Sequence, residues 1–112
     1  MTITNYQSQA CFEAWINCEN LLLNIAQLKN SLSNKIKHVL DECALLCMGT
    51  FKALKSRSHD VSRLALLCVG ICEECAELCE AQKESEFKDC AKVCRECSNA
   101  ISHLAFPAAI LQ

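Results

Sequence analysis

Residues 68–79 read CVGICEECAELC and residues 90–97 read CAKVCREC, and these two segments decide the fold. Consecutive cysteines are three or four residues apart throughout both segments. Steps of three and four return to one face of an α-helix, whereas a strand would require steps of two. Each segment therefore predicts a helix with a stripe of thiols along one face. The stripes consist of Cys68, Cys72, Cys75 and Cys79, and of Cys90, Cys94 and Cys97.

The rest of the chain adds two more helices of the same kind. Cys11 and Cys18 lie seven residues apart and Cys43 and Cys47 lie four apart, so each pair shares a helix face. Short polar breaks separate the four helices, and Ser85 is the expected N-cap of the last one. Helical periodicity covers residues 8–30, 34–55, 61–82 and 86–105. Four helices with short connections predict an all-α, antiparallel up-down-up-down four-helix bundle with inward-facing cysteines.

Length and composition exclude several classes of protein. The 112 residues suffice for a single domain, residues 1–112, and an apolar content of 52% suffices for its core. The 11 basic and 13 acidic residues nearly balance, which removes the field that attracts nucleic acid. The longest apolar run, residues 64–72, is too short to cross a bilayer. We therefore expect neither nucleic acid nor a membrane as a partner.

Cysteine content is the unusual feature, with 11 in the chain. Such density is typical of secreted disulfide scaffolds, but residues 1–9 lack the basic start and apolar segment of an export signal. An odd number of cysteines also cannot pair completely within one chain. We therefore expect a cytoplasmic location, where reduced thiols indicate metal binding or redox chemistry.

The thiols occupy the core positions at which a bundle normally places Leu or Ile. Single buried cysteines commonly act as small hydrophobic residues, but a whole stripe of them would leave the core underfilled. Something else should occupy that volume. Below the thiols the stripes become apolar, with Leu54, Val61, Ala65, Ile101 and Leu104.

Helix rise predicts the height of each thiol in the bundle. We call the end with the connections after residues 30 and 82 the upper end. Cys43, Cys72 and Cys94 are expected at one level, and Cys18, Cys47, Cys68 and Cys97 at the level below. Cys75 and Cys90 are expected higher, Cys79 nearest the upper end, and Cys11 alone near the lower end. Cys79 would then be the first thiol that an incoming ion meets.

Thiolates are soft ligands that suit Cu(I), zinc and iron–sulfur clusters. Zinc sites are usually tetrahedral quartets on turns, and iron–sulfur ligands usually come from loops. Cu(I) requires only two or three thiolates and tolerates sulfurs that bridge adjacent ions, so a helical column of thiols suits it best. Ten thiols would bind between about five and about ten ions, depending on bridging. Zinc remains an alternative.

The segments from Cys68 to Cys97 resemble the four-helix-bundle copper-binding family, the bacterial copper storage proteins. That family repeats Cys-Ala-x-x-Cys-x-x-Cys-Ala along its last two helices. The resemblance implies a cytoplasmic Cu(I)-storage or buffering protein, usually a tetramer. We expect it to be non-enzymatic and to receive copper from a donor protein or a small-thiol complex, and we expect all eleven cysteines to be metal ligands. Ile101 stands where the family often has another cysteine, and residues 80–86 lack the histidines of many relatives.

A thiol–disulfide redox protein is the alternative from another class, but its reactive thiol should be exposed at the start of a helix. His38, His59 and His103 are expected to be solvated rather than ligands. The acidic residues of the third helix (Glu73, Glu74, Glu77 and Glu80) are expected to form a solvated face. Phe12, Trp15, Leu22 and Leu23 make the first helix apolar nearly all round, which predicts an oligomer interface.

Overall fold

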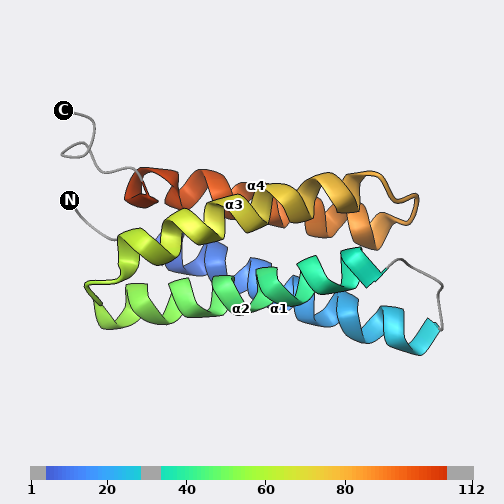
Figure 1. Cartoon of the computed structure of the whole chain (residues 1–112), viewed down its shortest axis with the longest axis horizontal. Coiled ribbons are helices and arrows are strands. Elements are labelled where there is room, and N and C mark those ends of the chain that lie inside the picture. The colour runs from blue at the N-terminus through green and yellow to red at the C-terminus, as the bar shows by residue number, and fades with distance from the viewer. Residues whose placement is uncertain (1–4, 29–33, 106–112) are drawn as a thin grey trace.

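The structure is a computed structural model that describes residues 5–28 and 34–105. It contains four helices: α1 (Asn5–Leu28), α2 (Asn34–Ser56), α3 (Val61–Glu80) and α4 (Ser85–Ala105). Successive helices run antiparallel, so the end of α1, the start of α2 and the α3–α4 connection lie together at the upper end, on the right in Figure 1. The α2–α3 turn lies at the lower end. The predicted all-α, up-down-up-down bundle is confirmed.

The helix boundaries lie close to the predicted ones. α1 begins at Asn5 rather than Ser8, and α3 ends at Glu80 rather than Gln82. Predicting Ser85 as a cap was wrong, because Ser85 is the first helical residue. The carbonyl of Glu84 accepts the first backbone hydrogen bonds of α4 instead.

A tight turn ends α2 and leads into α3. Arg57 adopts a left-handed conformation with φ 55°. The N–H of Ser58 donates to the carbonyl of Ala53 at 2.9 Å, and that of Arg57 to the carbonyl of Leu54 at 3.4 Å. This pair of bonds is the Schellman motif, which satisfies the last carbonyls of a helix. The turn at residues 57–60 therefore joins α2 to α3 closely.

Each helix packs against two neighbours, so the bundle has four lines of helix contact, which we call seams: α1–α2, α2–α3, α3–α4 and α1–α4. Buried alanines such as Ala14, Ala44 and Ala76 let the helices approach one another. The buried side chains are mainly cysteines in the middle of the bundle and mainly larger apolar groups at both ends. The larger groups are Leu21, Ile25, Ile36, Leu40 and Phe87 at the upper end, and Leu54, Ile101 and Leu104 at the lower end, where Ala65 is also buried.

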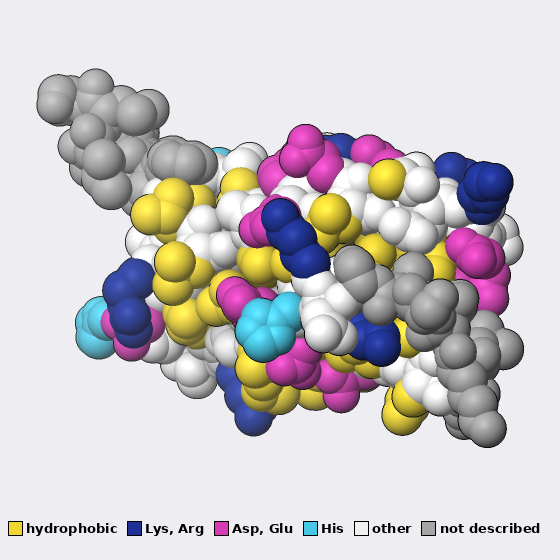
Figure 2. All heavy atoms as spheres, turned by 45° about the vertical axis from the view of Figure 1, so that its right-hand side comes forward, with side chains coloured by type: hydrophobic (Ala, Val, Ile, Leu, Met, Phe, Trp, Pro, Cys, Tyr) yellow, Lys and Arg dark blue, Asp and Glu magenta, His cyan; other side chains and the backbone are white. Residues whose placement is uncertain are grey.

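The surface carries charges of both signs with apolar side chains between them (Figure 2). In the described part of the chain, no helix has the length and apolarity that crossing a membrane requires. Several large apolar side chains are exposed. They are Tyr6, Phe12, Leu23, Leu45, Leu66 and Leu67.

Candidate metal centre

All eleven cysteines are buried, and none is more than 1% exposed. Their sulfurs form a continuous set along the bundle axis, which we call the thiol column. Neighbouring sulfurs within the column lie 3.6–3.9 Å apart where they are in direct contact. This separation is van der Waals contact between free thiols, far longer than the S–S bond of about 2.05 Å in a disulfide.

One group in the column draws on all four helices. Cys18, Cys43, Cys75 and Cys94 have sulfurs that all lie within 4.8 Å of one another. The Cys43 sulfur lies 3.8 Å from that of Cys94, across the diagonal between α2 and α4. Four soft ligand atoms this close together could hold a metal ion.

A second four-sulfur group lies directly below. Cys47, Cys68, Cys72 and Cys97 also have sulfurs within 4.8 Å of one another. The Cys47 sulfur contacts those of Cys68 and Cys72, each at 3.6 Å. The two groups are in contact, because the Cys43 and Cys72 sulfurs are 3.8 Å apart. Ions in the two groups would therefore be close enough to share bridging sulfurs.

A third group of three sulfurs lies nearest the upper end. It consists of Cys75, Cys79 and Cys90, and it shares Cys75 with the first group. A large side chain of α4 separates these thiols from solvent at the upper end. Phe87 lies one turn above Cys90 and is itself only 3% exposed. The expectation that Cys79 is accessible at the upper end was therefore wrong, because Cys79 is 0% exposed.

The two cysteines of α1 lie higher than predicted. The Cys11 sulfur is 3.7 Å from that of Cys97, so Cys11 joins the column rather than lying alone. The Cys18 sulfur contacts those of Cys90 and Cys94 at 3.8 and 3.9 Å, which places it above the Cys47 level. Both errors have one cause. The end of α1 extends beyond the upper ends of the other helices, so the whole helix is displaced along the axis (Figure 1).

Contacts among the thiols alter their acidity. Hydrogen bonds with Cys11 lower the pKa of Cys68, and lower that of Cys97 to about 6. The same contacts, together with burial, raise the pKa of Cys11 well above the usual range. Hydrogen bonds with Cys18 likewise lower the pKa of Cys43 and of Cys94, while the pKa of Cys18 rises. A neighbour that keeps its proton thus stabilises a thiolate that has lost one, which reduces the cost of a first deprotonation.

No charged side chain is buried in the described core; the buried polar residues there are Gln7, Ser8, Thr50 and Ser98. Charge is confined to the surface, where it is partly paired. Arg95 on α4 donates to Glu73 at 2.6 Å and, with two nitrogens, to Glu80 at 2.8 Å. The acidic face of α3 stays in contact with solvent as predicted, with Glu73 and Glu80 45% and 49% exposed, but these two residues also bind Arg95.

The histidines lie away from the thiols, as the sequence predicts. His38, His59 and His103 are exposed.

Thr50 lies on the buried stripe of α2 that the sequence predicts, but the sequence does not reveal its role. It is 0% exposed, continues the α2 stripe below Cys47, and donates its hydroxyl to the carbonyl of Leu46 at 2.7 Å. Thr50 therefore ends the thiol column on α2.

Residues 3–106 match the sequence profile of the family described as Csp, copper storage protein. The chain belongs to the copper storage protein family. The match confirms the resemblance that the sequence indicates.

Two individual proteins are similar to this copper storage family member. One is the uncharacterized cysteine-rich protein YhjQ of Bacillus subtilis (strain 168), 29% identical over 105 residues, with 88% of this chain and 95% of that protein covered. The other is the solved structure of the Cu(I)-bound copper storage protein BsCsp3. Its TM-score is 0.84 at 23% identity, with coverage of 93% of this chain and 99% of that one. This second likeness supports the four-helix fold.

Proposed function

We propose that this protein stores and buffers Cu(I) in the cytoplasm and that its eleven cysteines are the ligands. The observation that carries the proposal is the thiol column: all eleven sulfurs are buried, unoxidised and close enough to share metal ions. The role is one of binding and release, with no reaction catalysed. Reduced thiols at this density suit a reducing compartment.

Charge favours Cu(I) over zinc. Four thiolates around one Zn²⁺ leave a net charge of −2, and the described core has no buried cation to offset it. One Cu(I) per thiolate, with each sulfur bridging two ions, leaves the column neutral. We therefore expect bridged copper at nearly one ion per thiol, toward the upper limit that the sequence predicts.

An anaerobic titration with Cu(I) against a competing chelator tests the function. We expect saturation near ten ions per chain, with about one proton released per ion because each thiolate binds as a neutral unit with copper. Saturation at one or two ions would contradict storage. Metal analysis of the protein from cells grown with both metals distinguishes copper from zinc. Two zinc ions per chain, with about four protons released per zinc ion in a titration, would support zinc binding instead.

A redox role requires a thiol that a substrate disulfide can reach. All eleven are at most 1% exposed, so the free-thiol count should fall only slowly during incubation with a disulfide substrate under native conditions. Rapid loss of two thiols would support the redox alternative.

We also propose that the protein forms a homo-oligomer, a tetramer in particular. Support comes from the exposed apolar side chains of α1, α2 and α3, among them Leu23 at 60%, Leu45 at 56% and Leu67 at 49% exposure. Copper would reach it from a donor protein or a small-thiol complex, since free Cu(I) binds thiols tightly. Sedimentation equilibrium of the native chain and of Leu45→Lys gives the association state of each.

A further inference from the structure

The bundle consists of two helical hairpins, α1–α2 and α3–α4, and each is joined internally by side-chain contacts. In α3–α4, Arg95 binds Glu73 and Glu80 with three charge-assisted hydrogen bonds of 2.6–2.8 Å. In α1–α2, the ring of Phe51 packs against the rings of Phe12 and Trp15, with centroids 5.6 and 6.1 Å apart. Each hairpin can therefore move as a unit relative to the other.

Two seams join the hairpins, and they differ in strength. Across α2–α3, the turn at residues 57–60 links the helices covalently, and Thr50 donates to the carbonyl of Leu64 at 3.4 Å. No short connection links α1 to α4. Over residues 5–28 and 34–105, no ion pair crosses the α1–α4 seam. A side-chain contact between Gln7 and His103, at 3.4 Å, joins the two helices near the lower end.

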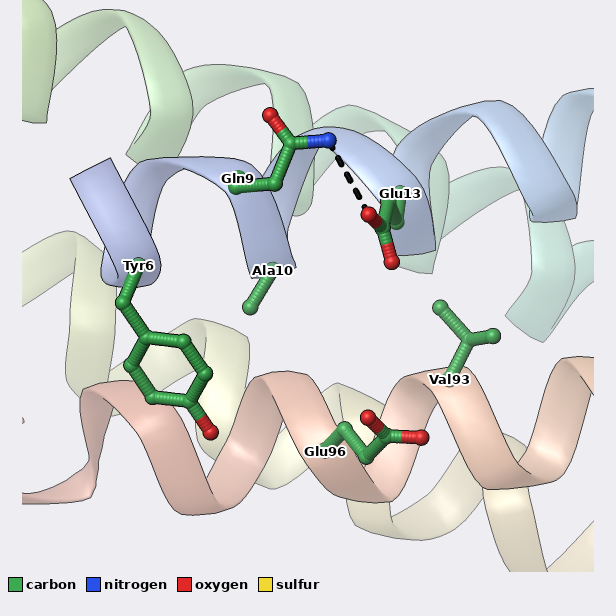
Figure 3. Close-up of a pocket in the computed structure, with 6 residues that line it drawn as sticks. All are labelled: Tyr6, Gln9, Ala10, Glu13, Val93 and Glu96. Atoms are coloured by element: carbon green, nitrogen blue, oxygen red, sulfur yellow. Dashed lines mark hydrogen bonds between the residues drawn. The ribbon is translucent and has the colours of Figure 1, made fainter.

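The α1–α4 seam is also hollowed twice. One hollow of about 90 Å³ lies between Tyr6, Gln9, Ala10 and Glu13 of α1 and Val93 and Glu96 of α4 (Figure 3). Another of about 130 Å³ lies farther up the same seam, where Asn17, Asn20, Leu21 and Asn24 face Glu86 and Asp89. Each could hold a few water molecules, whose share of liquid volume is about 30 Å³.

Charge adds to the weakness of this seam. Glu13 and Glu96 project from opposite helices into the first hollow (Figure 3). α1 contains no Lys or Arg, so it offers no cation to the carboxylates of α4. Like charges that face one another oppose close packing. The carboxylates of Glu13 and Glu96 thus weaken the α1–α4 seam by repulsion. They are not ligands for a soft ion.

Three sulfur contacts of the thiol column cross this same seam. Cys18 contacts Cys90 and Cys94, and Cys11 contacts Cys97. Separation of α1 from α4 would uncover these sulfurs first. The upper end offers no such access, since Phe87 and Leu40 are buried there at 3% and 0% exposure.

We propose that the α1–α4 seam is the opening through which the thiols are reached: the α1–α2 and α3–α4 hairpins part along this seam and stay joined along α2–α3. As a route for Cu(I), the proposal rests on the proposed function. As an opening motion, it concerns the apo protein alone. A bound ion would afterwards hold the seam closed, because its ligands come from both hairpins.

Pairing opposite charges across the seam should slow the opening. Glu13→Arg places a cation opposite Glu96, and Glu96→Arg places one opposite Glu13. The double variant restores like charges. Glu74→Arg, at an exposed position on α3, makes the same change in net charge away from the seam. The primary measurement is the labelling rate of the apo thiols by iodoacetamide, a neutral reagent whose approach does not depend on protein charge.

We expect each single seam variant to slow labelling about two- to fivefold, the range that an exposed ion pair supports. The double variant and Glu74→Arg should label at the native rate, and 1 M salt should remove the differences. Initial rates of Cu(I) transfer from a chelator should follow the same order. Far-UV circular dichroism verifies that each variant is folded.

Other results would overturn the proposal. If the double variant is slower than either single variant, net charge rather than pairing controls access. If the seam variants label at the native rate and Phe87→Ala labels faster, the opening lies at the upper end. If labelling follows the expected order but no variant and no native protein binds copper, the seam opens as proposed and the copper-storage function is wrong.

Discussion

The middle and the ends of the core differ in what fills them. At the ends, side chains such as Leu40 and Ile101 are buried completely, and each contributes about 1.5–3 kcal/mol by leaving water. In the middle, cysteine side chains occupy the equivalent positions and bury less apolar area. The ends are therefore suited to holding the helices together without metal, while the middle is suited to receiving a ligand that completes it.

Copper removal is the change that should separate the two regions most. We expect the apo protein to keep its far-UV helicity, because the apolar ends remain intact. Each saturated site adds about 2.7 kcal/mol at 100 times its Kd, so the loaded protein should melt more than about 10 °C higher. Thermal unfolding of both forms under anaerobic conditions measures this. A random-coil apo spectrum would mean that the ends are insufficient.

Single substitutions in the two regions should have opposite signatures. Ile101→Ala should lower the free energy of unfolding of the apo protein by about 2–4 kcal/mol, through lost burial and a residual cavity, with copper capacity unchanged. Cys47→Ala should cost about 1 kcal/mol, on the scale of one buried methylene, and should remove about one ion. Urea unfolding and chelator titration of both variants give the two quantities.

If Ile101→Ala lowered capacity, or if Cys47→Ala destabilised the apo protein as much as Ile101→Ala does, the division between middle and ends would be wrong. Leu104→Ala, which removes a second side chain from the lower end, serves as a matched control for Ile101→Ala. It should also leave the capacity unchanged.

The sequence predicts this division well because both parts of it depend on helix rotation. Spacings of three and four place Cys68 and Cys72 on the same face as Ala65, whichever way the helix is moved along its axis. Cys72 was expected at the level of Cys43 and Cys94 but belongs to the four-sulfur group below them, whereas Cys43 and Cys94 share a group as predicted. The helices of Cys43 and Cys94 begin or end close to where the sequence places them, so counting residues gives their heights.

The local sequence does not determine the position of each helix along the bundle axis. The height of Cys11 and Cys18 depends on how far α1 extends past α2, which the packing of the whole bundle decides. The Arg95 contact was missed for a related reason. Glu73 and Glu80 are seven residues apart on α3, so they share a face, but which α4 side chain lies opposite follows only from the relative heights of the helices.

Thr50 marks the boundary between the middle and the lower end, and its replacement by cysteine gives the finest test of that boundary. Its side chain is buried and follows Cys47 by three residues on the same stripe. Thr50→Cys would put a sulfur one turn below the second four-sulfur group and remove the hydroxyl contacts with Leu46 and Leu64. The volumes are similar, so stability should change by less than about 1.5 kcal/mol.

We expect Thr50→Cys to raise the Cu(I) capacity by about one ion, because a new thiolate next to Cys47 can bridge to copper already bound there. Thr50→Val, which keeps the shape without a sulfur, is the control and should keep the native capacity. An anaerobic titration of both variants decides the point. If Thr50→Cys binds no more copper than Thr50→Val, the lower limit of the column is set by the space that Leu54 and Ile101 fill. The missing ligand at position 50 would then not be the cause.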